Sequence, residues 1–133
     1  MNYLVDTHIL LWSFLEPDKL SKNVKNTLLH GENKIYYSPV SLWEISIKYG
    51  NEKLFLNGGT PDDFFNELND SYFICKSIEP LHLITNYKLP IYHKDPFDRI
   101  LIWEAISSDL ILISTDENFE IYTKEGLKLL QNI

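Results

Sequence analysis

The chain has 133 residues, 44% of them apolar, which is the size and composition of one globular domain spanning residues 1–133 with a single core. It has no apolar run that could cross a bilayer, no signal-peptide pattern at its start, and one cysteine, Cys75, which excludes an internal disulfide; we therefore expect a cytoplasmic protein. Its 19 acidic and 12 basic residues (net charge −7) argue against passive coating of nucleic acid by clustered basic side chains.

In the first half of the chain, hydrophobic periodicity and turn residues predict two strands and four helices. In chain order we expect a strand over 3–5, helices over 9–15 and 20–29, a strand over 34–38, and helices over 41–50 and 61–68. Pro39 is expected to break the second strand. Ser41 and Glu44 then match a capping box, with Ser41 at the N-cap and Glu44 at N3 of the following helix.

The second half of the chain alternates in the same way. We expect a strand over 72–75, a helix from Glu79 to about Lys88, a central helix that begins near Pro96, a strand over 110–113, a short helix over 117–121 and a last strand over 127–130. Strands separated by helices predict an α/β domain with a mainly parallel sheet.

The central helix has a well-defined start. Asp95 suits the N-cap, Pro96 suits N1, where its missing N–H costs nothing, and Asp98 falls at N3. The residues that follow are apolar nearly all round, which predicts a helix buried against more than one neighbour. An acid at the start of such a helix serves either as a cap or as a ligand.

Four acids are expected to project from one edge of the sheet, because the carboxyl ends of parallel strands and the starts of the following helices meet there. Asp6 follows the first strand, and Asp116 follows the strand over 110–113. Glu44 and Asp98 are expected in the first turns of their helices, and Asp95 is a fifth acid nearby.

Two interpretations of these acids stay open. Taken singly, each is better explained as a helix cap, since an acid in a first turn contributes roughly 0.3–1 kcal/mol of stability. Taken together they favour a metal site, because carboxylates that converge repel one another unless a cation or a proton compensates. All-oxygen sites suit Mg²⁺ or Mn²⁺, and such an ion would invert the local charge where a phosphate binds.

Four motifs are recognisable in order along the chain: Leu4-Val-Asp-Thr-His-Ile-Leu-Leu-Trp12, Ser38-Pro-Val-Ser-Leu-Trp-Glu-Ile45 followed by Lys48, His93-Lys-Asp-Pro-Phe-Asp-Arg-Ile-Leu101, and Ser114-Thr-Asp-Glu-Asn-Phe119. Each is weak alone. Together, at this spacing, they resemble the PIN-domain nucleases, and within that family the VapC-type toxins of bacterial toxin–antitoxin pairs. The resemblance covers nearly the whole chain.

The resemblance implies a three-layer α/β/α sandwich and a Mg²⁺-dependent ribonuclease, with Mn²⁺ as an alternative ion. It further implies RNA as the substrate and a protein antitoxin as the partner. The acidic constellation of the family, which would bind metal, maps onto Asp6, Glu44, Asp98 and Asp116. Ser114 matches the family's Ser or Thr two residues before the last acid and is expected to hydrogen bond to phosphate or to water on the metal. Asp95 matches a local pattern of the subgroup.

Several neighbouring residues have less specific signals. Arg99 is expected either to contact phosphate or to pair with Glu44 or Asp95. His8 and His93 lie close to the proposed edge, but a histidine there is more often a local hydrogen-bonding residue than a catalytic one. The apolar stretches 9–15 and 45–49 favour a groove for an amphipathic partner segment and self-association as a homodimer, although core packing also explains many of these residues.

Two rival functions remain. The first is a non-catalytic PIN-like interaction module, in which the acids only cap helices. The second is a phosphoacceptor or phosphohydrolase that uses Asp6; it is weaker because position 8 is histidine, so Asp6 does not begin an Asp-x-Asp motif.

Overall fold

The computed structural model describes residues 1–133, and its centre is one five-stranded sheet in the order β3-β2-β1-β4-β5. Every neighbouring pair of strands is parallel, which confirms the expected sheet. The strands are β1 (Asn2–Val5), β2 (Lys34–Tyr37), β3 (Ile74–Cys75), β4 (Ile111–Ser114) and β5 (Lys128–Gln131). Because β1 is central and the chain later returns to its other side, the carboxyl ends of β1 and β4 meet at the point where the strand order reverses.

Helices connect all of these strands. The α-helices are α1 (Thr7–Leu15), α2 (Lys22–Leu29), α3 (Pro39–Gly50), α4 (Pro61–Asn69), α5 (Pro80–Ile84) and α6 (Pro96–Ser107). Three 3₁₀ segments complete the chain: η1 (Pro17–Lys19), η2 (Asn86–Lys88) and η3 (Glu117–Glu125). None of the helices combines the length and the apolar character needed to cross a lipid bilayer.

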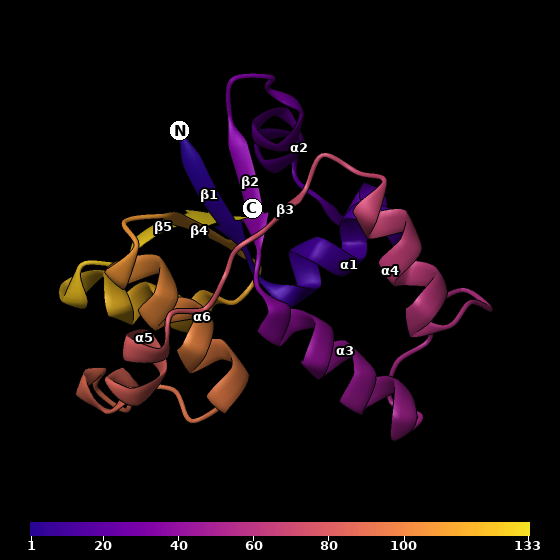
Figure 1. Cartoon of the computed structure of the whole chain (residues 1–133). Coiled ribbons are helices and arrows are strands. Elements are labelled where there is room, and N and C mark those ends of the chain that lie inside the picture. Colours follow the sequence, from indigo (N-terminus) through magenta and orange to yellow (C-terminus); the bar gives the residue numbers. More distant parts are fainter.

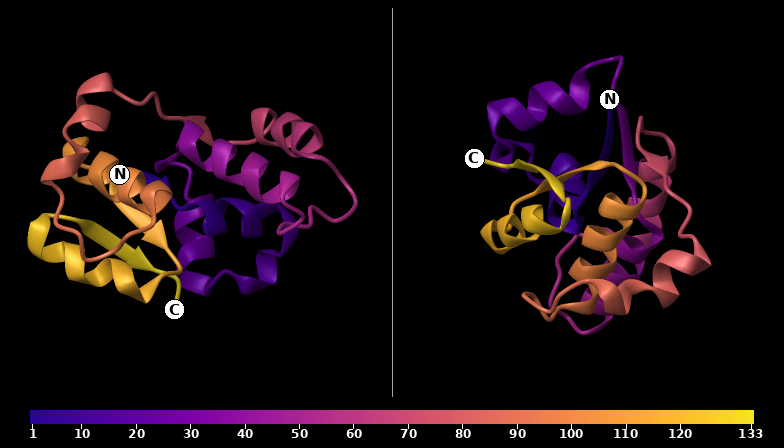
Figure 2. Two further views of the ribbon diagram at one scale, coloured as in Figure 1. Left: turned by 90° about the horizontal axis from the view of Figure 1, so that it is seen from below. Right: turned by 90° about the vertical axis from the view of Figure 1, so that its left-hand side faces the viewer.

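Different helices cover the two faces of the sheet (Figure 1 and Figure 2). Side chains alternate along each strand, so neighbouring residues enter different clusters. Val5 and Ile113 pack in a core with α1, α2, α3 and α4, whereas Leu4 and Leu112 pack with α6 and η3. These two cores confirm the three-layer α/β/α sandwich.

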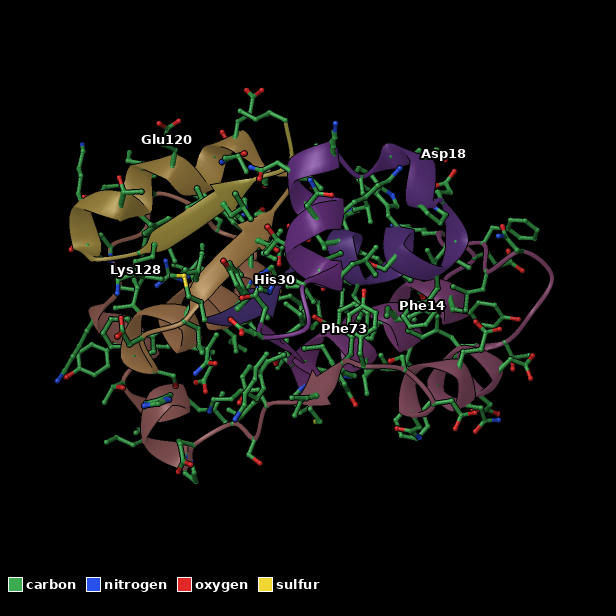
Figure 3. All side chains as sticks on the ribbon, turned by 90° about the horizontal axis from the view of Figure 1, so that it is seen from above. Phe14, Asp18, His30, Phe73, Glu120 and Lys128 are labelled. Carbon is green, nitrogen blue, oxygen red and sulfur yellow. The ribbon has the colours of Figure 1, made fainter.

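Aromatic packing attaches the segment after α3 to the first core. Phe14 of α1 lies beside Phe73, which precedes β3, with ring centroids 5.8 Å apart (Figure 3). Phe64 of α4 meets the same Phe14 ring edge-on at 5.2 Å. This cluster holds α4 and the approach to β3 against α1.

The start of α3 corrects the expected boundary. Ser38, rather than Ser41, is the N-cap, and its hydroxyl accepts a hydrogen bond from the backbone of Val40. Pro39 begins the helix, because proline at N1 has a preset φ and no hydrogen bond to lose. The capping box of Ser41 and Glu44 was therefore wrong, and Glu44 lies in the second turn of α3 rather than the first.

Candidate metal centre

Asp6 is held rigidly at the end of β1. Its Oδ1 caps α1 by accepting a hydrogen bond from the backbone of Ile9 at 2.8 Å. Its Oδ2 accepts from the Ser114 hydroxyl at 2.7 Å and from the Thr115 backbone at 3.1 Å. Burial raises the pKa of Asp6 above its ordinary value, and these three hydrogen bonds work against that rise by stabilising the ionised form.

Asp98 lies in the first turn of α6, and Asp95 is the N-cap of that helix, as the sequence predicts. Asp95 accepts hydrogen bonds from the backbone of Phe97 and Asp98. Asp98, by contrast, hydrogen bonds to a side chain: its Oδ2 lies 2.7 Å from Nε2 of His93. Burial raises the pKa of Asp98 to about 6; the hydrogen bond with His93 opposes the rise, and the negative charges of Asp95 and Glu44 add to it.

Asp116 reaches the same place from the end of β4. Its Oδ1 caps η3 by accepting from the Asn118 backbone, and its Oδ2 lies 4.0 Å from Nε2 of His93. The Ser114 hydroxyl accepts a hydrogen bond from the Asp116 backbone while it donates to Asp6. Ser114 therefore links the two strand-end acids directly.

The structure brings three of the predicted acids around one depression. This depression has a volume of about 450 Å³ and is lined by Asp6, His8, Asp98, Thr115, Asp116, Glu117, Asn118 and Phe119. Its position, outside the carboxyl ends of β1 and β4, is where open parallel sheets bind ligands. Only one of its lining residues is hydrophobic, so it is suited to a charged or polar ligand.

Glu44 does not line this depression. It is buried beside it, where Oε1 accepts a hydrogen bond from the Thr7 hydroxyl at 2.7 Å and Oε2 pairs with Lys48 at 2.6 Å. Because the Thr7 hydroxyl gives its one proton to Glu44, it accepts from the hydroxyl of Ser41, 2.9 Å away. The four-residue spacing of Glu44 and Lys48 on one helix was a signal for this ion pair. No sequence signal identified Thr7, apart from its place after Asp6.

Arg99 points away from the acids. Its guanidinium donates to the backbone carbonyls of Leu89 at 2.8 Å and Pro90 at 3.0 Å, and no ion pair joins it to Glu44 or Asp95. Tyr122 completes the arrangement, because its buried hydroxyl accepts from the backbone of His93 at 2.8 Å and donates to Pro90 at 2.9 Å. Arg99 and Tyr122 thus fix the irregular segment that positions His93.

The donor set fits a divalent cation. His93, Asp98 and Asp116 each offer one ligand atom, and these atoms all lie within 4.8 Å of one another. Carboxylates are hard oxygen ligands of the kind that Mg²⁺ and Mn²⁺ accept. The raised pKa of Asp98 indicates that its negative charge is poorly balanced by its surroundings, which is the condition that a bound cation relieves. His93 is a local hydrogen-bonding residue, as expected, but the direction of its ring toward the two acids could not be predicted from the sequence pattern.

Comparison with protein families gives a match to the PIN domain over residues 3–125. The chain belongs to the PIN domain family. Comparison with curated proteins finds no match. Among solved structures, this PIN domain is similar to VapBC2 from Rickettsia felis bound to a DNA fragment from its promoter, with 19% identity, a TM-score of 0.70, and 98% of each chain covered.

Two further solved structures share the fold of this PIN domain. DNA-bound VapBC from Salmonella typhimurium is 15% identical, covers 100% of this chain and 99% of that chain, and has a TM-score of 0.68. A toxin–antitoxin complex from Klebsiella pneumoniae is 16% identical, with 98% of both chains covered and a TM-score of 0.63. At these identities the likeness is one of fold.

Proposed function

We propose that this PIN domain is a ribonuclease that depends on Mg²⁺, or on Mn²⁺ in its place, and that it acts as the toxin of a toxin–antitoxin pair. The observation that carries the proposal is the convergence of Asp6, Asp98 and Asp116 on one polar depression from three separate parts of the chain. The similarity in fold to a toxin–antitoxin complex and to VapBC structures supports the biological role.

Each acid has a separate role in the proposed site. Asp98 and Asp116 would hold the ion, and Asp6 would face it from the floor of the depression, oriented by Ser114. When bound, the ion supplies a Lewis acid that polarises the phosphoryl oxygen and lowers the pKa of a water molecule. Glu44 stays paired with Lys48 and adds negative charge beside the site. It also accepts the hydrogen bond that anchors Thr7 at the start of α1.

The rival interaction module has one observation in its favour, since Asp6, Asp95 and Asp116 do cap helices. Asp98 argues against it. This acid accepts no helix-capping hydrogen bond, is largely buried with a raised pKa, and shares the depression with three further carboxylates, those of Asp6, Asp116 and Glu117. A carboxylate in that environment lowers the stability of the fold unless it has a ligand to bind. We therefore favour the metal-dependent enzyme.

A groove beside the site would suit the antitoxin. This groove of about 260 Å³ lies between α1 and α3, and its lining residues are Thr7, His8, Leu11, Trp12, Leu15, Glu16, Ile45, Lys48, Lys53, Leu54 and Phe55. Two of its charged residues already have partners, since Lys48 pairs with Glu44 and Glu16 with Lys19. The apolar lining together with Lys53 suits an amphipathic segment that carries an acidic residue. We propose that a segment of the antitoxin occupies this groove and that the toxin also forms a homodimer.

The direct test is cleavage of labelled RNA by the purified protein with Mg²⁺, with Mn²⁺ and with a chelator. We expect cleavage with either ion and none with the chelator. Asp6→Asn should lower the rate at least about 100-fold, because it removes a negative charge from the centre of the site. Asp18→Asn, at an exposed acid in η1, beyond the opposite end of α1 from Asp6, should leave the rate unchanged.

A second test addresses the toxin role. Expression of the wild type should arrest growth, expression of Asp98→Asn should not, and RNA ends mapped from arrested cells should show new cleavage sites. Equal arrest by the two proteins, or saturable metal binding without RNA cleavage, would favour the non-catalytic module instead.

A further inference from the structure

His93 directs one ring nitrogen at two acids of the candidate metal centre, Asp98 and Asp116. Its Nε2 is 2.7 Å from Oδ2 of Asp98 and 4.0 Å from Oδ2 of Asp116. We propose that His93 is a nitrogen ligand of the divalent ion, so that this PIN domain binds Mn²⁺ in preference to Mg²⁺. The inference rests on the proposed function, in which Asp98 and Asp116 hold that ion.

The distances suit a shared ion. Protein ligands bind such ions at about 2.0–2.2 Å, so two ligand atoms on one ion are at most about 4.4 Å apart. Both distances from Nε2 lie within that limit, and all three ligand atoms lie within 4.8 Å of one another. On binding, the ion would replace the proton of the hydrogen bond between Nε2 of His93 and Oδ2 of Asp98; the ring would keep one proton on Nδ1, and the displaced proton would go to solvent. Small side-chain movements would then bring the three ligand atoms around the ion.

Two backbone contacts and one ring contact hold His93 in place. The backbone N–H of His93 donates to the buried hydroxyl of Tyr122 at 2.8 Å, and its carbonyl accepts from Arg99 at 3.4 Å. Its ring packs edge-on against Phe119, with centroids 5.6 Å apart. A ligand fixed in this way loses little freedom when it binds metal, as expected of a residue built into a site.

His8 provides an internal contrast. His8 lines the depression itself, but it is exposed, and its ring packs against Trp12 rather than hydrogen bonding to a carboxylate. His93 is not one of the lining residues, yet its ring hydrogen bonds to Asp98, which is. The two histidines therefore differ in which of them hydrogen bonds to an acid of the site. Only His93 has the geometry of a ligand.

The identity of this ligand affects which ion is preferred. Mg²⁺ is a hard cation that takes oxygen ligands and gives up its own water molecules reluctantly. First-row transition ions accept imidazole nitrogen as well as carboxylate oxygen. A site with one nitrogen and two or three carboxylates should therefore discriminate against Mg²⁺, whereas a site made of the carboxylates alone should discriminate less.

Pulsed electron paramagnetic resonance of the Mn²⁺-loaded protein tests the ligand directly. We expect a ¹⁴N coupling in the wild type and in His8→Ala, and its loss in His93→Ala and His93→Asn, with thermal melting to confirm that each variant is folded. A wild-type spectrum with bound Mn²⁺ and no ¹⁴N coupling, or a coupling that survives in both folded His93 variants, would overturn the proposal.

Calorimetric titration tests the preference for the ion. We expect His93→Ala to weaken Mn²⁺ binding roughly tenfold or more and to change Mg²⁺ binding much less. Equal weakening of both ions would overturn the inference about His93 while leaving the nuclease proposal intact. Absence of saturable binding of either ion to the wild type would overturn both.

Discussion

The hydroxyl of Ser114 donates a 2.7 Å hydrogen bond to Oδ2 of Asp6, across 108 positions of the sequence. Both residues lie at the carboxyl ends of adjacent parallel strands, and both are almost completely buried. The same hydroxyl accepts from the Asp116 backbone at 3.0 Å. The Ser114 side chain therefore orients the carboxylate of Asp6 and also holds the backbone at Asp116.

Ser114→Ala should lower metal affinity and cleavage rate by roughly 10- to 100-fold, in line with losses seen when a residue that orients a metal ligand is removed. The cause is that Asp6 loses one of three donors while Asp116 loses its backbone anchor. The measurements are Mn²⁺ titration and the RNA cleavage rate. Ser108→Ala removes a similar bond, from a serine to Glu104 at the other end of α6, and should change neither quantity. Equal effects from the two variants would contradict this account.

Tyr122→Phe should act on the segment that carries His93. The Tyr122 hydroxyl accepts from the backbones of Tyr92 and His93, so phenylalanine leaves both N–H groups without this partner. We expect a loss of about 1–3 kcal/mol in the free energy of unfolding and faster hydrogen exchange at these two amides. Denaturant unfolding and exchange measured by NMR check both effects. Tyr87→Phe, at a tyrosine whose side chain is 78% exposed, is the control and should alter neither.

Much of the fold could be predicted because its signals are local. Asp95 as N-cap, Pro96 at N1 and Asp98 at N3 depend only on neighbouring residues, and all three are confirmed. The start of α3 was misplaced because Pro39 fits two roles: it can end a strand, and it can occupy the first position of a helix. The structure shows the second role, because the hydroxyl of Ser38 accepts a hydrogen bond from the backbone of Val40 and so caps the helix just before Pro39.

The candidate site was harder to predict because side-chain direction depends on distant parts of the chain. The edge of the sheet follows from strand order, and so the convergence of Asp6, Asp98 and Asp116 could be expected. The orientation of Arg99 could not, since its partners are carbonyls of an irregular segment that has no sequence period. His93 belongs to that segment, so its ring could not be placed without the packing around Tyr122.

Glu104→Gln should separate structural acids from functional ones. Glu104 is as buried as Glu44, but it lies in the C-terminal half of α6, where it pairs with Lys76 at 2.9 Å and His82 at 2.7 Å. These pairs fasten the segment after β3 and helix α5 to α6. Loss of the charge should cost roughly 1–3 kcal/mol of stability, measured by denaturant unfolding. The cleavage rate per folded molecule should stay unchanged; a large fall in that rate would show that this acid has a functional role.

Asp98→Asn should stabilise the metal-free protein near pH 8. The folded state raises the pKa of Asp98 from 3.8 to about 6, so the folded protein binds this proton more tightly than the unfolded chain does. Its contribution to stability is therefore fully present below about pH 3.8 and is lost as the pH rises through about 6. Asparagine removes the unfavourable charge, and Tm at pH 8 should rise by about 2–4 °C.

Two features make the Asp98→Asn comparison decisive. The gain in Tm should vanish near pH 4, where the wild-type carboxyl is protonated in the folded protein, and it should reverse when Mn²⁺ is added, because the ion stabilises the wild type more than the variant. Melting curves at pH 4 and pH 8, with and without Mn²⁺, check both features. Asp18→Asn, at an exposed acid, should follow the wild type throughout. If Asp98→Asn instead lowered Tm at pH 8 without metal, the pKa of Asp98 in the folded protein would not be raised. Asp98 would then stabilise the fold through its charge, and the argument that it is a metal ligand would fail.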